Sequence, residues 1–316
     1  MIITVTFNPS IDYVYFLEHF FVEGKHHRVE NPVRVIGGKG INSARAMKGM
    51  GADVLALTTS GSTNGLLMEK MLEQEGLPTE FLRIEDETRV CMTFMTDQEQ
   101  TELVEKGPAI SDSVVEEMTN KIVQLCATHD VQVVTLNGSM VHHDANVYAN
   151  LIETLRNQLP TTTRILADTS QPYLQALLER DVLPDFIKPN TKEISELIGR
   201  SISTKEEVVE VVTTSSLFNR IPFVLVSMGG DGAVAKIGNE LYDVTIPKIT
   251  IVNTTGSGDS TVAGVAYSIT QQFDNETTLK YAMGCGMSNA LHAEIGHVEK
   301  EEVEALVQQI HVTKLA

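Results

Sequence analysis

The sequence has few cysteines, fewer basic than acidic residues, and no long hydrophobic run. Only three of its 316 residues are cysteine, far apart and without a CxxC pair (Cys91, Cys126 and Cys285). This odd number argues against a disulfide framework or a zinc site and predicts reduced thiols. Lys and Arg total 24 against 42 Asp and Glu, which gives a net charge of −18. Such an acidic surface repels nucleic-acid backbones and anionic membranes, so neither is an expected partner.

The absence of long hydrophobic runs also restricts the class of protein. No run approaches the roughly 18 residues that a membrane-spanning helix requires. The segment MIITVTFNPS at residues 1–10 has no basic stretch and turns polar after residue 7, which is not the pattern of a signal peptide. We therefore expect a globular, cytoplasmic protein, long enough for one large domain or two modest ones.

What the sequence does contain is a regular alternation of apolar and helical segments. Short apolar runs predict strands at 1–7, 53–59, 131–136, 163–167 and 222–227. Helical periodicity predicts helices at about 40–50, 64–75, 111–127, 144–158, 190–198 and 204–218. Residues 233–246 predict a hairpin, and a further helix begins near Ser257. This order predicts an α/β fold in which helices cover both faces of a mostly parallel sheet.

Two stretches depart from the alternation. Residues 12–35 contain scattered aromatic residues without a helical period, and residues 79–105 include an alternating run at 90–95 that is typical of a half-buried antiparallel strand. We expect both stretches to form short strands outside the main sheet. Because the chain has no linker, internal repeat or low-complexity segment, residues 1–316 are expected to form one domain with a small β-rich insertion.

The segment Asn253–Asp259 (NTTGSGD) leads into the helix predicted from Ser257. Gly256 and Gly258 allow a sharp bend and leave backbone N–H groups unhindered at the positive end of the helix dipole, which suits an anion. The Asp259 carboxylate would repel a bound phosphate, so its natural role is to accept a proton from an attacking hydroxyl. The alternative is a plain helix cap. The Lys-Ser/Thr pair of a Walker A loop is missing.

A second glycine-rich segment, Gly37–Asn42 (GGKGIN), also leads into a helix. Gly38 allows close approach of the backbone, and Lys39 places a cation in that opening, which in so acidic a protein suits an anionic substrate. Asn42, one turn into the helix, has both a donor and an acceptor for a polyol. The alternative is a flexible loop with a solvated lysine.

Two charged residues of the β-rich stretches are further candidates. Asp12 follows the first strand, in the region where open α/β sheets bind ligands, and its carboxylate could take two sugar hydroxyls. A surface turn residue is the alternative. Arg89 opens the alternating strand and could bind a phosphate through its guanidinium fork. A solvated charge on an edge strand is the alternative.

Two strand ends carry the next candidates. In the segment 188–193 (KPNTKE), Asn190 and Glu193 form a capping-box pattern at the start of a helix. The same carboxylate could instead order Mg²⁺ through water, and the local sequence leaves both possibilities open. The glycines of segment 227–232 (SMGGDG) follow another strand, either as one wall of a nucleotide cleft or as a tight turn.

The nine histidines do not form a metal-binding pattern. His26-His27 and His142-His143 are adjacent pairs whose side chains are expected to diverge, and neither pair has a helical i, i+4 partner. His292 and His297 flank a predicted helix end, where a C-terminal cap and a nearby ligand are both open. No histidine is assigned to chemistry.

Taken together, the motifs match one family in order and spacing. They are TFNPSID at 6–12, GGKGxN near residue 40, ETRVC at 87–91, ELVEKGP at 102–108, KPNxxE at 188–193, SxGxxG at 227–232, GSGDSTVAG at 256–264 and GMSNA at 286–290. The chain resembles the PfkB/ribokinase-type carbohydrate kinases over essentially its full length. Within that family it is most similar to the branch of tagatose-6-phosphate kinases and 1-phosphofructokinases.

The resemblance implies a kinase that uses ATP and Mg²⁺ to phosphorylate a ketohexose monophosphate, with the C1 hydroxyl of tagatose-6-phosphate favoured. It implies a ribokinase-like sheet with a β-sheet lid from residues 12–35 and 79–105, which commonly also makes a homodimer contact. It implies the following roles: Asp259 as base; Gly256, Ser257 and Gly258 as anion hole; Asp12, Gly38 and Asn42 for sugar hydroxyls; Lys39 and Arg89 for the phosphate already on the sugar; Lys188, Asn190, Ser227, Gly229, Gly232 and Asn289 for ATP; and Glu193 for Mg²⁺, through water.

Alternatives stay open at this point. A 1-phosphofructokinase would use the same parts on fructose-1-phosphate. A catalytically inactive sugar-phosphate sensor is an alternative from another class, although a sensor need not keep Asp259. A ribokinase or nucleoside kinase fits less well, because Lys39 and Arg89 indicate a substrate that already carries phosphate. Many family members have Asp where this chain has Asn253, so no monovalent-cation role is assigned to this region.

Overall fold

The computed structural model describes residues 1–96 and 99–315, and its main feature is a large sheet. The ten strands lie in the order β14 (His311–Lys314), β13 (Glu240–Thr245), β12 (Ala233–Ile237), β11 (Phe223–Ser227), β10 (Phe186–Ile187), β9 (Arg164–Asp168), β8 (Val133–Asn137), β1 (Ile2–Thr6), β4 (Val54–Gly61) and β5 (Thr79–Ile84). From β11 to β5 all neighbours are parallel, and β12 to β14 add an antiparallel edge. The predicted mostly parallel sheet is confirmed.

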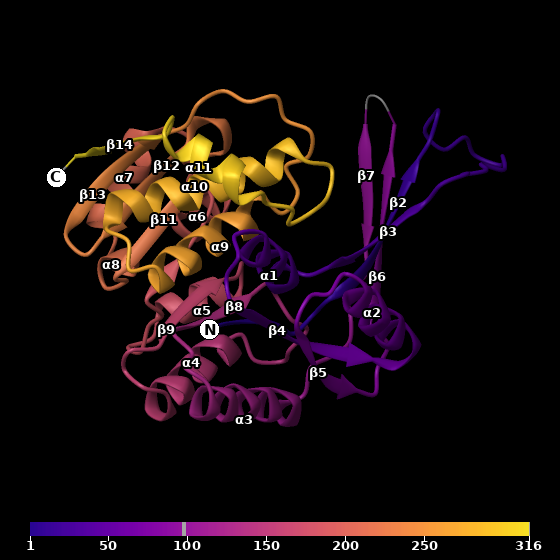
Figure 1. Ribbon diagram of the computed structural model, residues 1–316, viewed down its shortest axis with the longest axis horizontal. Helices are drawn as coiled ribbons and strands as arrows, with labels where there is room; N and C mark the ends of the chain where they lie inside the picture. The colour runs from indigo at the N-terminus through magenta and orange to yellow at the C-terminus, as the bar shows by residue number, and fades with distance from the viewer. Residues whose placement is uncertain (97–98, 316) are drawn as a thin grey trace.

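Helices cover both faces of this sheet (Figure 1). In chain order they are α1 (Lys39–Gly49), α2 (Ser62–Gln74), α3 (Asp112–Thr128), α4 (Val147–Gln158), α5 (Tyr173–Leu178), α6 (Thr191–Ile198), α7 (Lys205–Thr214), α8 (Ser216–Asn219), α9 (Ser257–Thr270), α10 (Asn275–Leu291) and α11 (Lys300–Val307), with a 3-10 turn at Gly229–Asp231. The prediction of one helix at 204–218 was wrong, because two helices, α7 and α8, occupy this range. Ser215 ends α7, and its hydroxyl caps α8.

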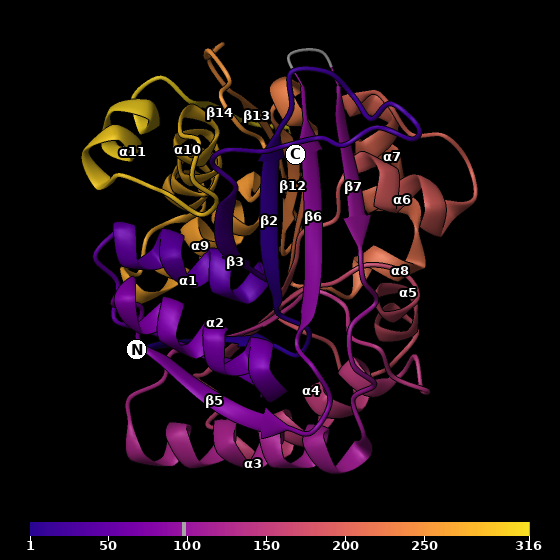
Figure 2. The same cartoon turned by 90° about the vertical axis from the view of Figure 1, so that its right-hand side faces the viewer.

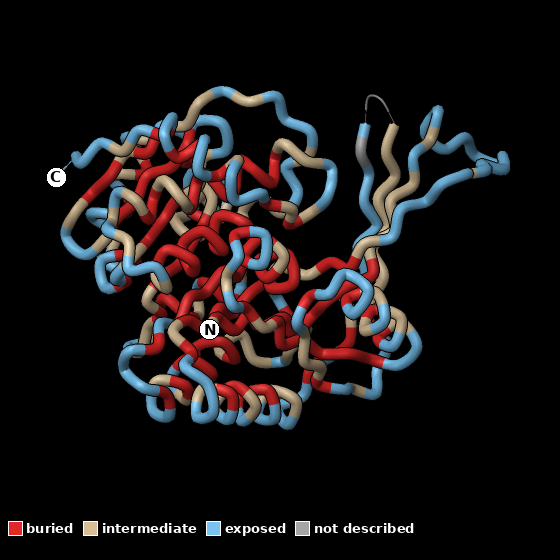
Figure 3. Tube along the Cα trace, in the orientation of Figure 1, coloured by how far each residue is buried: buried red, intermediate tan, exposed pale blue. Residues whose placement is uncertain are grey.

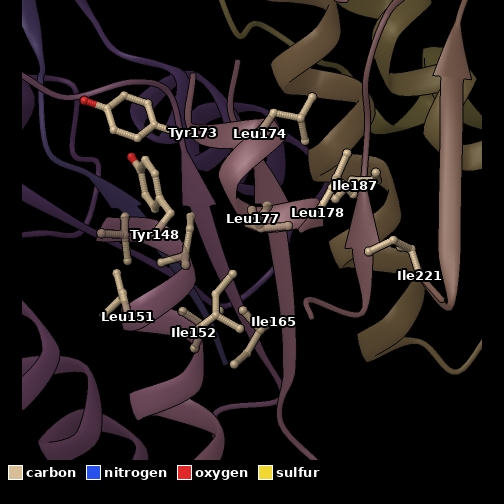
Figure 4. Close-up of a cluster of buried hydrophobic side chains, with 14 of the residues drawn as sticks. Tyr148, Leu151, Ile152, Ile165, Tyr173, Leu174, Leu177, Leu178, Ile187 and Ile221 are labelled. Atoms are coloured by element: carbon tan, nitrogen blue, oxygen red, sulfur yellow. The ribbon is translucent and has the colours of Figure 1, made fainter. Parts of the chain in front are cut away.

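Two hydrophobic cores flank the sheet, because successive side chains of a strand point to opposite faces. In β1, Ile2 packs in the core beneath α1, α2 and α9 to α11, whereas Ile3 and Val5 pack beneath α3 to α8. Strands buried on both faces are continuous apolar runs, which is why the sequence predicts them well. Figure 3 shows the buried interior, and Figure 4 shows where Tyr148 and Leu177 bring α4 and α5 together over β9.

A second, four-stranded sheet stands to one side of the main body (Figures 1 and 2). Its strands lie in the order β3 (Val33–Gly37), β2 (Ser10–Phe16), β6 (Arg89–Met95) and β7 (Gln100–Val104). β2 is antiparallel to β3 but parallel to β6, so the alternating run at 90–95 has one parallel neighbour. Figure 3 shows that the outer part of this sheet is mostly exposed.

One expectation about this sheet was wrong. Residues 79–84 form β5 and belong to the main sheet, because Phe81 and Leu82 pack against its two cores. The second stretch therefore contributes only β6 and β7, and its residues 97–98 lie outside the described part of the chain. The alternative of a surface turn residue does not hold for Asp12, because Asp12 lies within β2.

Two other expectations concern the whole chain. The three cysteines are free, as predicted. Within residues 1–96 and 99–315, no helix combines the length and the apolar character needed to cross a membrane.

Candidate active site

Polar side chains gather where the parallel strands of the main sheet end. Asn137, Asp168 and Ser227 are the last residues of β8, β9 and β11, and Lys188 directly follows β10. Parallel strands end at the same edge of a sheet, which is where open α/β sheets bind ligands. The first turns of α1 and α9 meet beside this edge, joined by hydrogen bonds between their side chains and backbone.

The loop before α9 has the geometry of an anion cradle. Gly256 precedes the helix with a φ of 83°, in the left-handed region that favours glycine, and a Cβ there would lie 2.7 Å from Ile295. Among the described residues, no acceptor faces the N–H groups of Gly256, Gly258 and Asp259. The N–H of Ser257 instead donates to the carbonyl oxygen of Thr254 at 3.2 Å. Three unpaired donors thus remain at a helix N-terminus, an arrangement that binds anions.

Asp259 is buried in the first turn of α9, with its carboxylate facing α1. Asn42 Nδ2 donates to Asp259 Oδ2 at 2.8 Å, and Ser43 Oγ donates to its backbone oxygen at 2.9 Å. Burial raises the pKa of Asp259 to about 6, although the nearby Lys39 ammonium acts to lower it. A carboxyl with a pKa near neutrality is well matched to proton transfer. The helix-cap alternative does not hold, because Gly256 occupies the cap.

An ion cluster lies beside Asp259, in which Asp168 and Lys188 are buried and the Lys39 side chain is 38% exposed. Asp168 Oδ2 accepts a hydrogen bond from Lys39 Nζ at 3.2 Å, and its Oδ1 lies 3.7 Å from Lys188 Nζ. Burial alone would raise the pKa of Asp168, but the two ammonium groups outweigh it and lower the pKa. Burial alone would lower the pKa of Lys39, but the carboxylates of Asp168 and Asp259 raise it. The cluster therefore holds two cations next to the anion cradle.

Glycines bring these groups close together. A Cβ on Gly258 would lie 3.0 Å from Lys188 Nζ, so a larger residue would displace that lysine. Gly38 has a φ of 126°, and a Cβ on it would lie 2.9 Å from the Thr6 side chain at the end of β1. The glycine at position 38 thus lets α1 start directly against the sheet edge, which places Lys39 and Asn42 in the site.

Arg45, on the next turn of α1, orients the Asn42 amide. Its Nη1 donates to Asn42 Oδ1 at 3.1 Å and to the carbonyl oxygen of Ile36 at 2.7 Å. Its Nε donates to Glu75 at 2.8 Å, which fixes the guanidinium from the far side. Because the amide oxygen of Asn42 is held by Arg45, its NH₂ group is turned toward Asp259.

Arg89 and Asp12 form a separate polar group at the base of the four-stranded sheet. The guanidinium of Arg89 donates to the carbonyl oxygens of Asn8 and Glu105, each at 3.1 Å, and its buried Nε has no partner among the described residues. No carboxylate in the described part of the chain lies within 4.0 Å of it. Burial raises the pKa of Asp12, against the opposing effect of Arg89, and one oxygen of Asp12 is buried without a donor. Both side chains thus have spare capacity for a polar ligand.

The segments after β10 and β11 lie side by side. Asn190 and Glu193 form a complete capping box, with Glu193 Oε2 accepting from the N–H of Asn190 at 2.8 Å. Asn190 and Ser227 are joined by a parallel β-bridge. Gly232 is required for packing, since a Cβ there would lie 2.0 Å from the carbonyl oxygen of Val244. Gly229 has open space around its Cβ position.

Asn289 lies beneath the anion loop and has no exposed surface. Its Nδ2 donates to the carbonyl oxygen of Thr255 at 2.9 Å and to Ser257 Oγ at 3.1 Å, and its Oδ1 accepts from the N–H of Gly296 at 2.7 Å. All its hydrogen bonds serve the protein itself. Asn289 thus supports the loop that forms the cradle.

The expectation that adjacent histidines diverge was wrong for one pair. The rings of His142 and His143 have centroids 4.3 Å apart, and both face Asp112. The turn at 142–144 fixes the His142 ring, because Nδ1 lies 3.0 Å from the backbone N and 3.2 Å from the carbonyl oxygen of Asp144, and this places Nε2 3.1 Å from Asp112 Oδ1.

Residues 5–300 match the model of the pfkB family of carbohydrate kinases. The chain belongs to that family. It is 34% identical over 316 residues to the tagatose-6-phosphate kinase of Staphylococcus epidermidis, covering all of both chains. The crystal structure of a Staphylococcus aureus protein described as a putative phosphofructokinase aligns with a TM-score of 0.81 and 27% identity. The alignment covers 100% of this chain and 99% of that one. Phosphofructokinase-2 from Escherichia coli in complex with potassium aligns with a TM-score of 0.85 over 97% and 98%, and its 23% identity supports the fold alone.

As a pfkB family member, the protein is an ATP-dependent sugar kinase. The structure brings together Asp259, Asn42 and Lys39 with the cradle, and it places Arg89 with Asp12 instead of with Lys39.

Asp168, which joins the two lysines of this kinase, was missed by the sequence analysis. The strand predicted at 163–167 ends one residue before it. A carboxylate directly after a buried strand, at the edge where ligands bind, is the signal that could have identified it.

Proposed function

We propose that the protein transfers the γ-phosphoryl group of ATP to the C1 hydroxyl of tagatose-6-phosphate. The observation that carries this proposal is the position of Asp259, a buried carboxyl with a pKa of about 6 beside three unpaired N–H groups and two lysines. The name of the curated relatives, which match over their full length, supports the choice of sugar.

In this proposal Asp259 accepts the proton of the attacking hydroxyl. Asn42 holds the carboxylate in place through the 2.8 Å hydrogen bond. The amides around Gly256–Gly258, together with that of Asp259, receive the oxygens of the transferred phosphoryl group. Since phosphoryl transfer has a loose transition state with charge on the equatorial oxygens, positioned donors contribute more than base strength. Lys188 and Lys39 add positive charge on either side of Asp168.

The sugar phosphate is proposed to bind between α1 and the four-stranded sheet. Asp12 and Asn42 receive sugar hydroxyls, and Gly38 allows the sugar to approach the backbone. Arg89 binds the phosphate that the substrate already carries, since its guanidinium has no carboxylate partner within 4.0 Å in the described part of the chain. Lys39, which sequence reasoning paired with Arg89, acts closer to the transferred group because Asp168 holds it there.

The residues after β10 and β11 are proposed to form the ATP side, with Lys188, Asn190, Ser227, Gly229 and Gly232. The donor set fits a water-bound Mg²⁺, because Glu193 Oε1 accepts no hydrogen bond from the described residues while Oε2 is fixed by the capping box. Glu193 also raises the pKa of Lys39, which indicates that it faces the same site. Bound Mg²⁺ would neutralise charge on the phosphate oxygens. Asn289 acts indirectly, through the loop.

The four-stranded sheet is proposed to act as a lid and as a homodimer contact. Tyr15 on β2 and Phe94 on β6 stack with centroids 5.4 Å apart, and Phe21 packs edge-on against Phe94. Leu103 on β7 lies on the same face and is 59% exposed. This aromatic face fits a second copy of the sheet. Leu103→Glu should convert a dimer into a monomer in light scattering, and an unchanged mass, or a monomeric parent chain, would contradict the contact.

The substrate is tested by ADP release with MgATP against a panel of tagatose-6-phosphate, fructose-1-phosphate, fructose-6-phosphate, ribose and adenosine. The highest kcat/KM is expected for tagatose-6-phosphate, with the product identified as the 1,6-bisphosphate. A preference for fructose-1-phosphate would make the protein a 1-phosphofructokinase with the same machinery. A preference for ribose or adenosine would remove the phosphate-binding role of Arg89. Binding of sugar phosphates without ADP release would indicate a sensor.

A further inference from the structure

Two histidines and a glutamate meet on the segment between α10 and α11. One ligand atom from each of His292, His297 and Glu299 lies within 4.8 Å of the others. The two rings have centroids 4.4 Å apart, and His297 Nε2 lies 3.2 Å from Glu299 Oε1. A tetrahedron with bonds of about 2.0 Å, as zinc makes to imidazole nitrogen and carboxylate oxygen, has an edge of roughly 3.3 Å. The spacing of this pair already suits a shared ion.

A half-buried carboxylate, that of Glu302, lies beside His292. His292 Nε2 lies 3.1 Å from Glu302 Oε2, and Ser288 Oγ donates to the same oxygen. Within the described residues, His292 Nδ1 has no hydrogen-bond partner. Histidines that bind metals usually donate their second ring N–H to a carboxylate, which fixes the tautomer and makes the free nitrogen more basic. Glu302 therefore leaves Nδ1 of His292 as a nitrogen ready to bind an ion.

The segment that carries these side chains is held firmly. The N–H of Gly296 donates to Asn289 Oδ1, and a Cβ on Gly296 would lie 2.7 Å from the carbonyl oxygen of Asn42. A Cβ on Gly49 would lie 2.0 Å from the carbonyl oxygen of Val298, so α1 packs directly on the segment. Because the backbone is fixed by α1 and α10, binding an ion would require ordering only of the side chains.

We propose that His292, His297 and Glu299 bind a divalent transition-metal ion of the Zn²⁺ class, with water completing its coordination. Imidazole ligands favour Zn²⁺, Co²⁺ and Ni²⁺, whereas Mg²⁺ takes oxygen ligands, so this site is chemically distinct from the magnesium of the nucleotide. Asn253 Nδ2, at the start of the anion loop, donates to the carbonyl oxygen of Ala293 at 3.0 Å. A bound ion would therefore also hold in place the backbone to which this loop is hydrogen-bonded.

The cluster of Asp112, His142 and His143 is the natural control, since its ligand atoms also lie within 4.8 Å of one another. There, the side chains of His143 and Asp112 are 71% and 80% exposed, against 41% and 54% for His297 and Glu299. More exposed side chains lose more conformational freedom when they are ordered around an ion. We therefore expect a lower affinity at this second cluster.

Titration of the full chain with Co²⁺ alone, without ATP, tests the proposal. The visible absorption of Co²⁺ on nitrogen ligands reports binding independently of kinase activity. We expect one equivalent to bind, excess Mg²⁺ not to displace it, and His143→Ala to leave it unchanged. His297→Ala and Glu299→Ala should each weaken binding at least tenfold, and Glu302→Gln should weaken it by about 10- to 100-fold.

Three results would overturn the proposal. They are no absorption with Co²⁺, an affinity of His297→Ala and Glu299→Ala equal to that of the parent protein, or loss of binding in His143→Ala. The side chain of Glu299 is 54% exposed, so its variant keeps the test valid if another variant fails to fold.

Discussion

Asn42 Nδ2 lies 2.8 Å from Asp259 Oδ2 and joins the first turns of α1 and α9 across the site. This hydrogen bond lowers the pKa of Asp259, whereas burial raises it, and the result is a pKa of about 6. Since a general base acts only when deprotonated, kcat/KM should rise with pH and level off above about 6. Initial rates between pH 5 and 8 measure this limb. A flat profile over that range would contradict the role of Asp259.

Asn42→Ala separates the titration of Asp259 from that of the substrate phosphate, whose second pKa is also near 6. Without the Asn42 donor, the carboxylate loses stabilisation, so the rising limb should move to higher pH. The titration of the substrate phosphate is the same in both proteins. An unshifted limb in Asn42→Ala would therefore assign the limb to the substrate.

Arg45→Met should also move the rising limb of kcat/KM to higher pH, but by less than Asn42→Ala does, because Arg45 acts on Asp259 only through the Asn42 amide. We expect a lower kcat, a KM for ATP within about twofold of the parent, and a small upward shift of the limb. Glu75→Gln is the matched control, since it weakens the ion pair of Arg45 but keeps its 3.1 Å hydrogen bond to Asn42. If Arg45→Met and Glu75→Gln changed kcat and the limb equally, the effect would come from lost packing around Arg45 and not from the Asn42 hydrogen bond.

Asp259→Asn should reduce kcat by about 10²- to 10⁴-fold, the usual contribution of a general base, while ATP affinity stays the same. The folded-state pKa of about 6 lies above the value near 3.9 of an unfolded chain, so the carboxyl destabilises the fold increasingly from about pH 4 to 6 and fully above that. The variant should thus have a higher Tm than the parent at pH 8 and an equal Tm near pH 4. Unchanged turnover, or a lower Tm at pH 8, would contradict this account.

The sequence predicts the parts of this protein that depend on local pattern. The strands of the main sheet are buried on both faces, so their apolar runs are visible without tertiary information. The loop before α9 and the start of α1 have glycines at positions where the backbone needs them, Gly256 and Gly38. These local signals locate the cradle and Asp259, the proposed base.

Pairings between distant segments are not visible in the same way. The strand at 79–84 has the same character as the β-rich stretch that follows, and only its packing against β4 assigns it to the main sheet. Asp168 and Lys39 are 129 residues apart in the chain, and their contact depends on β9 ending where α1 begins. Sequence motifs identified Lys39 and Arg89 as cations, but only the fold shows that Asp168 lies beside Lys39 and Asp12 beside Arg89, which is why we propose different roles for them.

Asp168→Asn would leave Lys39 and Lys188 without their shared counter-ion. Removing one partner from a buried ion pair, as Asp168 and Lys188 form, costs about 3–5 kcal/mol, so the free energy of unfolding at pH 7 should fall by that order. The pKa of Asp168 is lowered in the folded state, so its contribution is complete above about pH 4 and is lost progressively as pH falls toward the lowered pKa. Denaturant melts should therefore show a large difference in unfolding free energy at pH 7, and this difference should decrease as the pH is lowered below about 4. Because the Asp168 carboxylate also raises the pKa of Asp259, the rising limb of kcat/KM should move to lower pH.

Arg89→Met tests whether the substrate already carries a phosphate. Hydrogen bonds to charged groups contribute about 1.5–3 kcal/mol, so KM for the sugar phosphate should rise by roughly 10- to 100-fold while KM for ATP is unchanged. Arg83→Met is the matched control, because Arg83 lies on β5, is 69% exposed and pairs with Glu69. If KM for ATP rises instead, the guanidinium belongs to the nucleotide side. If neither changes, Arg89 serves only to hold the carbonyls of Asn8 and Glu105, and the phosphate must bind at Lys39.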